Sequence, residues 1–144
     1  MLKFLSIVGL IVMVAGIVGL LKIGVLFSSQ PVTIAVQVLA VALLIWARVT
    51  FGRRSFHAAA NPTEGGLVTS GPYHYIRHPI YTAACLFGWA SIVTHLSFLS
   101  VAFGVLMFVG SLIRMLAEER LVRERYPEYS QYSNTTKRMI PGVF

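Results

Sequence analysis

A polar, aromatic-rich stretch from Gly71 to Tyr81 lies between two strongly apolar halves of the chain. It contains Tyr73, Arg77, His78 and Tyr81, whose side chains offer hydrogen-bond donors, positive charge and flat aromatic faces. Such groups can hold a polar small molecule, because a cation pairs with a carboxylate and an aromatic ring stacks on a base. We therefore expect the function of the protein to reside here.

A second polar stretch begins with Glu118 and Glu119, after the last apolar run, and continues through Tyr132 and Arg138. Its carboxylates can accept hydrogen bonds from amino and hydroxyl groups or take up a proton as a base. A simpler interpretation also exists for them. Two adjacent glutamates are common on a solvated helix face, and Arg114 and Glu118 have the i, i+4 spacing of an intrahelical ion pair.

The composition indicates an integral membrane protein. Of the 144 residues, 56% are hydrophobic and 12% are charged, and the mean hydropathy of +0.75 is too high for a soluble domain of this size. The net charge of +7 is explained by basic loops on one side of a membrane, so no nucleic acid is expected as a partner. Cys85 is the single cysteine and the histidines lack a ligand pattern, so neither a disulfide nor a metal is predicted.

The predicted fold is an all-α integral membrane protein that forms a single domain, 1–144. Each apolar run is long enough to cross, or nearly cross, a hydrocarbon core of about 30 Å at a helical rise of about 1.5 Å per residue. The third run is the shortest, so we expect a short or tilted helix there. Ala15 and Gly19 are predicted to allow close helix approach in the first span. The predicted segments are spans at 4–27, 32–51, 79–95 and 98–116, a loop at 52–78 and a tail at 117–144.

The distribution of charge predicts the topology. With four spans, every lysine and arginine except Lys22 falls on the same side of the membrane. Positively charged residues are retained on the cytoplasmic side, so we expect both termini, the loop and the tail to be cytoplasmic. The loop 52–78 can then meet the C-terminal helix and tail at the membrane surface, where the two polar stretches would form one site.

The joint pattern of these stretches resembles a known family. It comprises Gly-Pro-Tyr at 71–73, Arg-His-Pro-Ile-Tyr at 77–81 and Glu-Glu at 118–119, followed by Tyr126, Tyr129, Tyr132, Arg138 and Ile140-Pro141. The pattern resembles the isoprenylcysteine carboxyl methyltransferase family in its short prokaryotic form, and the related phospholipid methyltransferases. The resemblance covers about residues 61–144, and the first two spans match only as generic apolar helices. Pro127 and Ala83 depart from it, since glycine is usual at the first position and frequent at the second.

The resemblance implies an S-adenosylmethionine cofactor at the cytosolic edge of the bundle, and a lipid-like acceptor that enters from the bilayer of a prokaryotic inner or plasma membrane. It also implies the cofactor-binding residues. The first motif would contribute Tyr73, Arg77, His78, Pro79 and Tyr81, and the second Glu118, Glu119, Tyr132 and Arg138.

The acceptor determines which residues would be catalytic. A carboxylate acceptor is already anionic and needs only a positioning cation, for which Arg114 or Arg48 would serve. An amine must lose a proton, which gives Glu118 or Glu119 the role of a base. A thiol acceptor is also compatible with the pattern. We therefore expect Arg114 and Glu119 to be catalytic, and the sequence does not choose the acceptor.

Two other classes of function compete with this interpretation. Membrane sterol reductases share an Arg-His-Pro-containing region that faces the cytosol and binds NADPH, but they have far more spans than four. The protein could instead be a small, non-enzymatic membrane protein that binds a partner, with the polar stretches as anchors. Titration with S-adenosylmethionine, S-adenosylhomocysteine and NADPH distinguishes these classes.

Overall fold

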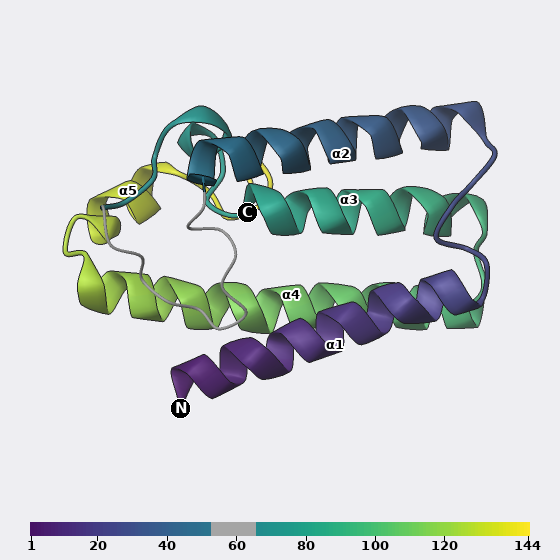
Figure 1. Ribbon diagram of the computed structural model, residues 1–144, viewed down its shortest axis with the longest axis horizontal. Coiled ribbons are helices and arrows are strands. Elements are labelled where there is room, and N and C mark those ends of the chain that lie inside the picture. Colours follow the sequence, from purple (N-terminus) through teal and green to yellow (C-terminus); the bar gives the residue numbers. More distant parts are fainter. Residues whose placement is uncertain (53–65) are drawn as a thin grey trace.

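The computed structural model describes residues 1–52 and 66–144, and these residues form an all-α protein (Figure 1). The elements in chain order are α1 (Leu2–Lys22), α2 (Pro31–Phe51), the 3₁₀ helix η2 (Gly71–His74), α3 (Pro79–Thr94), α4 (Phe98–Arg125) and α5 (Tyr129–Thr135). The all-α prediction is thus confirmed. Much of the predicted loop 52–78, including its basic residues Arg53 and Arg54, lies outside the described residues.

Helices α1, α2 and α4 are each long and apolar enough to cross a membrane, and α3 is a shorter apolar helix, as the sequence predicted. Large apolar side chains along α2, among them Val38, Leu39 and Val49, are exposed. Exposure of this kind suits contact with lipid rather than water. The chain is therefore an integral membrane protein.

The first helix ends at Lys22, whereas the sequence predicted a span to Phe27. Gly24 has a φ of 71°, in the left-handed region that glycine adopts without strain. The amides of Val25 and Leu26 then turn back to the carbonyl of Leu20. Leu26 is buried and Val25 packs against the same cluster, so these apolar residues belong to the turn and do not extend the helix.

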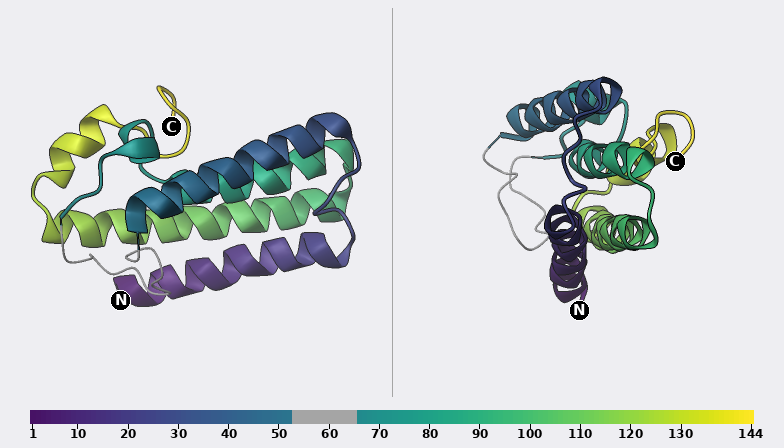
Figure 2. Two further views of the ribbon diagram at one scale, coloured as in Figure 1. Left: turned by 45° about the horizontal axis from the view of Figure 1, so that its top comes forward. Right: turned by 90° about the vertical axis from the view of Figure 1, so that its right-hand side faces the viewer.

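The apolar helices pack as two close pairs, α1 along α4 and α2 along α3 (Figure 2). Glycines bring α1 and α4 together: a Cβ at Gly16 would lie 2.6 Å from the backbone nitrogen of Met107, and a Cβ at Gly110 would clash with the backbone of Met13. The predicted pair of Ala15 and Gly19 is wrong in part, because Ala15 is exposed. Small residues at a helix contact permit this approach of backbones.

Helix α4 continues through the predicted span into the charged region and ends at Arg125. It begins with a capping box between Ser97 and Ser100, in which each side chain bonds to the backbone of the other. It ends before Pro127, since a proline disfavours helical backbone at the preceding residue, and Tyr126 is indeed extended. The last turns of α4 thereby carry the two glutamates beyond the apolar part of the helix.

Candidate active site

Helices α3 and α4 form a hairpin whose open end brings the two polar stretches together. The turn at 95–97 joins them at one end, so the start of α3 and the charged end of α4 lie toward the other. Figure 1 shows η2 and α5 at this same end of the bundle. The meeting of the two stretches, which the sequence predicted, is therefore a consequence of the hairpin.

The two stretches are also joined through their backbones. The amide of Arg77 donates to the carbonyl of Lys137 at 2.8 Å, and the amide of His78 donates to that of Arg138 at 2.9 Å. Residues Ile76 and Lys137 form an isolated parallel bridge. The sequence carried no signal of this pairing, because neither segment has the alternating pattern of a strand.

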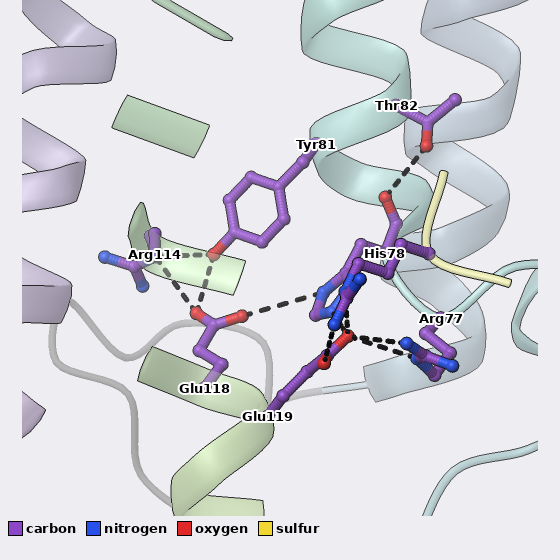
Figure 3. Close-up of polar contacts among 8 residues, drawn as sticks. Arg77, His78, Tyr81, Thr82, Arg114, Glu118 and Glu119 are labelled. Atoms are coloured by element: carbon purple, nitrogen blue, oxygen red, sulfur yellow. Dashed lines mark hydrogen bonds and ion pairs between the residues drawn. The ribbon is translucent and has the colours of Figure 1, made fainter. Parts of the chain in front are cut away.

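Glu119 is the centre of a buried ionic network (Figure 3). Its Oε1 accepts from Arg77 Nε at 3.1 Å and Nη2 at 3.0 Å, and from Arg138 Nε at 3.0 Å. Its Oε2 accepts from Arg138 Nη2 at 3.1 Å, and His78 Nε2 lies 3.1 Å from Oε1. The side chain is only 4% exposed, so these partners occupy the carboxylate. Glu119 thus fastens the tail to the first motif.

Arg77 extends this network to α5. Its Nη1 donates to the carbonyl of Ser133 at 2.7 Å and also to the carbonyl of Thr136. These carbonyls lie at the C-terminal end of α5, where backbone acceptors lack helical partners and a cation is favourable. One guanidinium therefore connects α4 with the end of α5.

Glu118 faces a different set of partners. Tyr81 Oη donates to its Oε1 at 2.6 Å, while Arg114 Nε lies 2.5 Å from Tyr81 Oη and 3.0 Å from Glu118 Oε1. His78 Nδ1 lies 4.0 Å from its Oε2. The predicted intrahelical pair of Arg114 and Glu118 is confirmed, and Tyr81 of α3 joins it. Glu118 keeps 23% of its side chain exposed, unlike its neighbour.

Aromatic side chains cover the site from η2 and α5. Tyr132 Oη donates to the carbonyl of Tyr73 at 2.5 Å, and the rings of Tyr73 and Phe51 lie 5.4 Å apart. Burial raises the pKa of Tyr132 to about 12, from an ordinary value of about 10, so its hydroxyl keeps the donated proton further into alkaline pH. Burial also raises the pKa of Tyr73 and the charge of Glu118 raises it further, whereas the charge of Arg48 lowers it. The contact between the rings of Tyr73 and Phe51 places the last turn of α2 beside η2.

The structure brings most of the predicted site residues together in one network, and it adds one residue that the sequence did not indicate. Pro79 is the first residue of α3, where its missing amide leaves no helical bond unmade. Thr82, which the sequence did not indicate, donates to the carbonyl of Met139 at 3.2 Å and so holds the tail to α3. The residues in the combined network are Arg77, His78, Tyr81, Arg114, Glu118, Glu119 and Arg138, with Tyr73 and Tyr132 beside them.

The fold and the site define a helical membrane protein with a polar, carboxylate-containing site at one end of the bundle. Residues 30–129 match the family model of the phospholipid methyltransferases, and this is more than half of the chain. The chain belongs to this family and is a membrane methyltransferase. Searches of curated proteins and of solved structures returned no match. The matched range includes α2, which the sequence had suggested only as a generic span, and it stops before Tyr132 and Arg138.

Proposed function

We propose that the protein transfers a methyl group from S-adenosylmethionine to an acceptor dissolved in the membrane, at the site around Glu118. One observation carries the proposal: the hairpin brings both polar motifs together and leaves Glu118, next to Tyr81 and Arg114, as the more exposed of two adjacent carboxylates. The acceptor would be a lipid-like or isoprenoid-linked carboxylate, amine or thiol, as in isoprenylcysteine carboxyl methyltransferases.

The residues present fit this cofactor. Its amino and hydroxyl groups need carboxylate acceptors, its carboxylate needs a cation, and its adenine needs an aromatic face. Glu118 supplies the first, and Arg114 and Arg48 are candidates for the second. The candidate aromatic face is Tyr73, a buried ring that packs against Phe51. S-adenosylmethionine supplies an electrophilic methyl group on a sulfonium.

The tail would exclude water and fix the geometry of the site. Arg77 and Arg138 hold the tail through Glu119, and Tyr132 holds α5 against η2. Alignment of the acceptor with the transferable methyl is the main requirement of a direct displacement, so a rigid enclosure contributes to the rate.

The role of a base falls to Glu118 in this proposal, although the sequence suggested Glu119. Burial opposes the charge of Glu119, but hydrogen bonds from His78 and Arg138 and the charge of Arg77 outweigh it and lower its pKa to about 2, which makes Glu119 a poor base. For an amine acceptor, Glu118 would receive the proton. For a carboxylate acceptor, Arg114 would position the anion and no base is needed.

Calorimetric titration of the purified protein tests the proposal. We expect S-adenosylmethionine and S-adenosylhomocysteine to bind and NADPH not to bind. Binding of NADPH alone would instead indicate a reductase, and binding of none of the three would contradict the assignment. Transfer of labelled methyl into a panel of an isoprenoid-linked carboxylate, phosphatidylethanolamine and a lipophilic thiol then identifies the acceptor.

A further inference from the structure

The chain from Met139 to Phe144 is apolar throughout and folds back on itself. The amides of Met139 and Ile140 donate to the backbone oxygen of Phe144 at 2.6 and 2.7 Å, and Gly142 makes the turn with a φ of 75°. We call residues 139–144 the apolar hook. A positive φ is unstrained in glycine, so the sharp return depends on this residue.

The apolar hook packs at the seam between α3 and α4. Met139 is 6% exposed and belongs to a cluster with Tyr81 and Cys85 of α3 and Met115 of α4, and Phe144 packs against the same cluster. Figure 2, in its right-hand view, shows the end of the chain beside α3, on the side away from α2. The apolar hook therefore closes the part of the seam that lies next to the candidate site.

The seam leads directly to the polar groups of the site. Tyr81, Cys85 and Trp89 are spaced by four residues, so they lie along one face of α3. The ring of Tyr81 belongs to the apolar cluster, while its hydroxyl donates to Glu118. A hydrocarbon chain lying along this face would have its polar end at Glu118.

The surroundings of the apolar hook favour exchange with lipid. Ile140 is 52% and Val143 is 74% exposed, so the outer surface of the hook is itself apolar and suits contact with hydrocarbon. Inside a bilayer, moving apolar side chains from protein to lipid costs little, because lipid chains are as apolar as the side chains. Thr82 provides a polar link from α3 to Met139, and it also donates to the carbonyl of His78.

We propose that the apolar hook is a displaceable plug of the acceptor entrance, and that the hydrocarbon chain of the acceptor takes the place of Met139 and Phe144 between α3 and α4. This inference rests on the proposed function, because it assumes an acceptor that is dissolved in the membrane. It predicts that opening of the hook admits lipid chains to the α3 face that carries Cys85 and Trp89.

Quenching of Trp89 by brominated lipid tests the plug directly. The protein has two tryptophans, so Trp46→Phe leaves Trp89 as the single emitter. The protein is reconstituted in nanodiscs of phosphatidylcholine with dibrominated acyl chains, and its emission is compared with that in nanodiscs of unbrominated lipid. In this background, Gly142→Ala strains the turn of the apolar hook because an alanine disfavours the positive φ at this position. An added Cβ meets no neighbouring atom, so the strain comes from the backbone alone. We expect it to shift the equilibrium between closed and open hook toward the open form by roughly tenfold.

The matched control is Gly24→Ala, since Gly24 has nearly the same φ, 71°, and equally open space, but lies in the turn after α1. We expect at least a doubling of Trp89 quenching in Gly142→Ala and in Phe144→Ala, and no change in Gly24→Ala. Phe144→Ala removes plug volume without straining the backbone, so it decides the matter where Gly142→Ala does not fold.

Equal quenching of Trp89 in the parent and in all three variants would overturn the plug. A rise in quenching in Gly24→Ala as large as that in Gly142→Ala would also overturn it, because it would show that the whole bundle loosens. The assay contains no cofactor. Increased quenching without binding of S-adenosylmethionine would therefore contradict the proposed function alone, and cofactor binding without increased quenching would contradict the plug alone.

Discussion

Glu118 and Glu119 are adjacent in the chain, yet their carboxylates have different guanidinium partners and share only His78 (Figure 3). Glu119 is enclosed by Arg77, His78 and Arg138, whereas Glu118 meets Tyr81 and Arg114. Successive residues of a helix point about 100° apart, so neighbours face different elements. We interpret Glu119 as the residue that holds the site together and Glu118 as the residue that meets the ligand.

Substitution of the two glutamates should therefore give different results. Glu119→Gln leaves the guanidinium groups of Arg77 and Arg138 without their anion, and breaking a buried pair in this way costs about 3–5 kcal/mol. We expect a clear fall in the thermal unfolding temperature. Glu118→Gln should lower the unfolding temperature less, because Glu118 is more exposed and pairs with Arg114 alone among the guanidinium groups. It should weaken binding of S-adenosylmethionine by tenfold or more, measured by calorimetry, in line with loss of a charged hydrogen bond of about 1.5–3 kcal/mol.

Glu124→Gln is the matched control, because Glu124 is exposed on the same helix. It should alter neither property. Equal losses of stability in Glu118→Gln and Glu119→Gln would contradict the division of roles.

The hydrogen bond between Tyr132 and Tyr73 should make docking of α5 sensitive to alkaline pH. Burial raises the pKa of Tyr132 to about 12, from about 10 in an unfolded chain. The folded state thus favours the neutral phenol, so this contribution is complete below pH 10 and is lost as the pH rises from about 10 to about 12. Tyr132→Phe removes both the hydrogen bond and the ionisation.

At neutral pH we expect Tyr132→Phe to be less stable by about 1 kcal/mol, the usual value of one hydrogen bond. Denaturation at rising pH should show this difference shrink above about pH 10. Tyr75→Phe serves as the control, since Tyr75 is exposed, and its stability should follow that of the parent at every pH. A constant difference between Tyr132→Phe and the parent would exclude the proposed ionisation.

The sequence allowed prediction of which segments form the site but not of the role of each residue. Motif spacing placed Arg77, His78, Glu118 and Glu119 together, and the α3–α4 hairpin explains why. It could not distinguish the two glutamates, because their partners are set by residues about forty positions away and by the rotation of α4. The same reason hid the contact of Thr82 with the tail.

The fold was predictable where hydrophobicity determines it. Apolar runs located the long helices, since a membrane-spanning segment must satisfy its backbone internally. The end of α1 and the helix α5 were missed. The first depends on the backbone conformation of Gly24, and the second is a short polar helix whose end is held by Arg77 rather than by an apolar face.

Close contact of α1 and α4 should make Gly110 sensitive to any added side chain. A Cβ there would clash with the backbone of Met13, which cannot move like a flexible side chain. We expect Gly110→Ala to destabilise the protein by about 1–3 kcal/mol, the range for overpacking. Unfolding in increasing concentrations of denaturing detergent measures the loss. Ala15→Leu, on the exposed face of α1, should be neutral, and a comparable loss there would contradict the packing of this pair.

The basic residues at the ends of the helices predict the orientation in the membrane. Lys3 lies at the start of α1 and Arg125 at the end of α4, and the charge rule assigns both of these ends to the cytoplasm. Lys22 lies at the opposite end of α1. In a Cys85→Ser background, we expect Lys3→Cys and Arg125→Cys to react with a membrane-impermeant maleimide only in inverted vesicles. Lys22→Cys should react only in right-side-out vesicles. The reverse pattern would place the site outside the cell, where an intracellular pool of S-adenosylmethionine could not supply it, and would thus contradict both the topology and the proposed function.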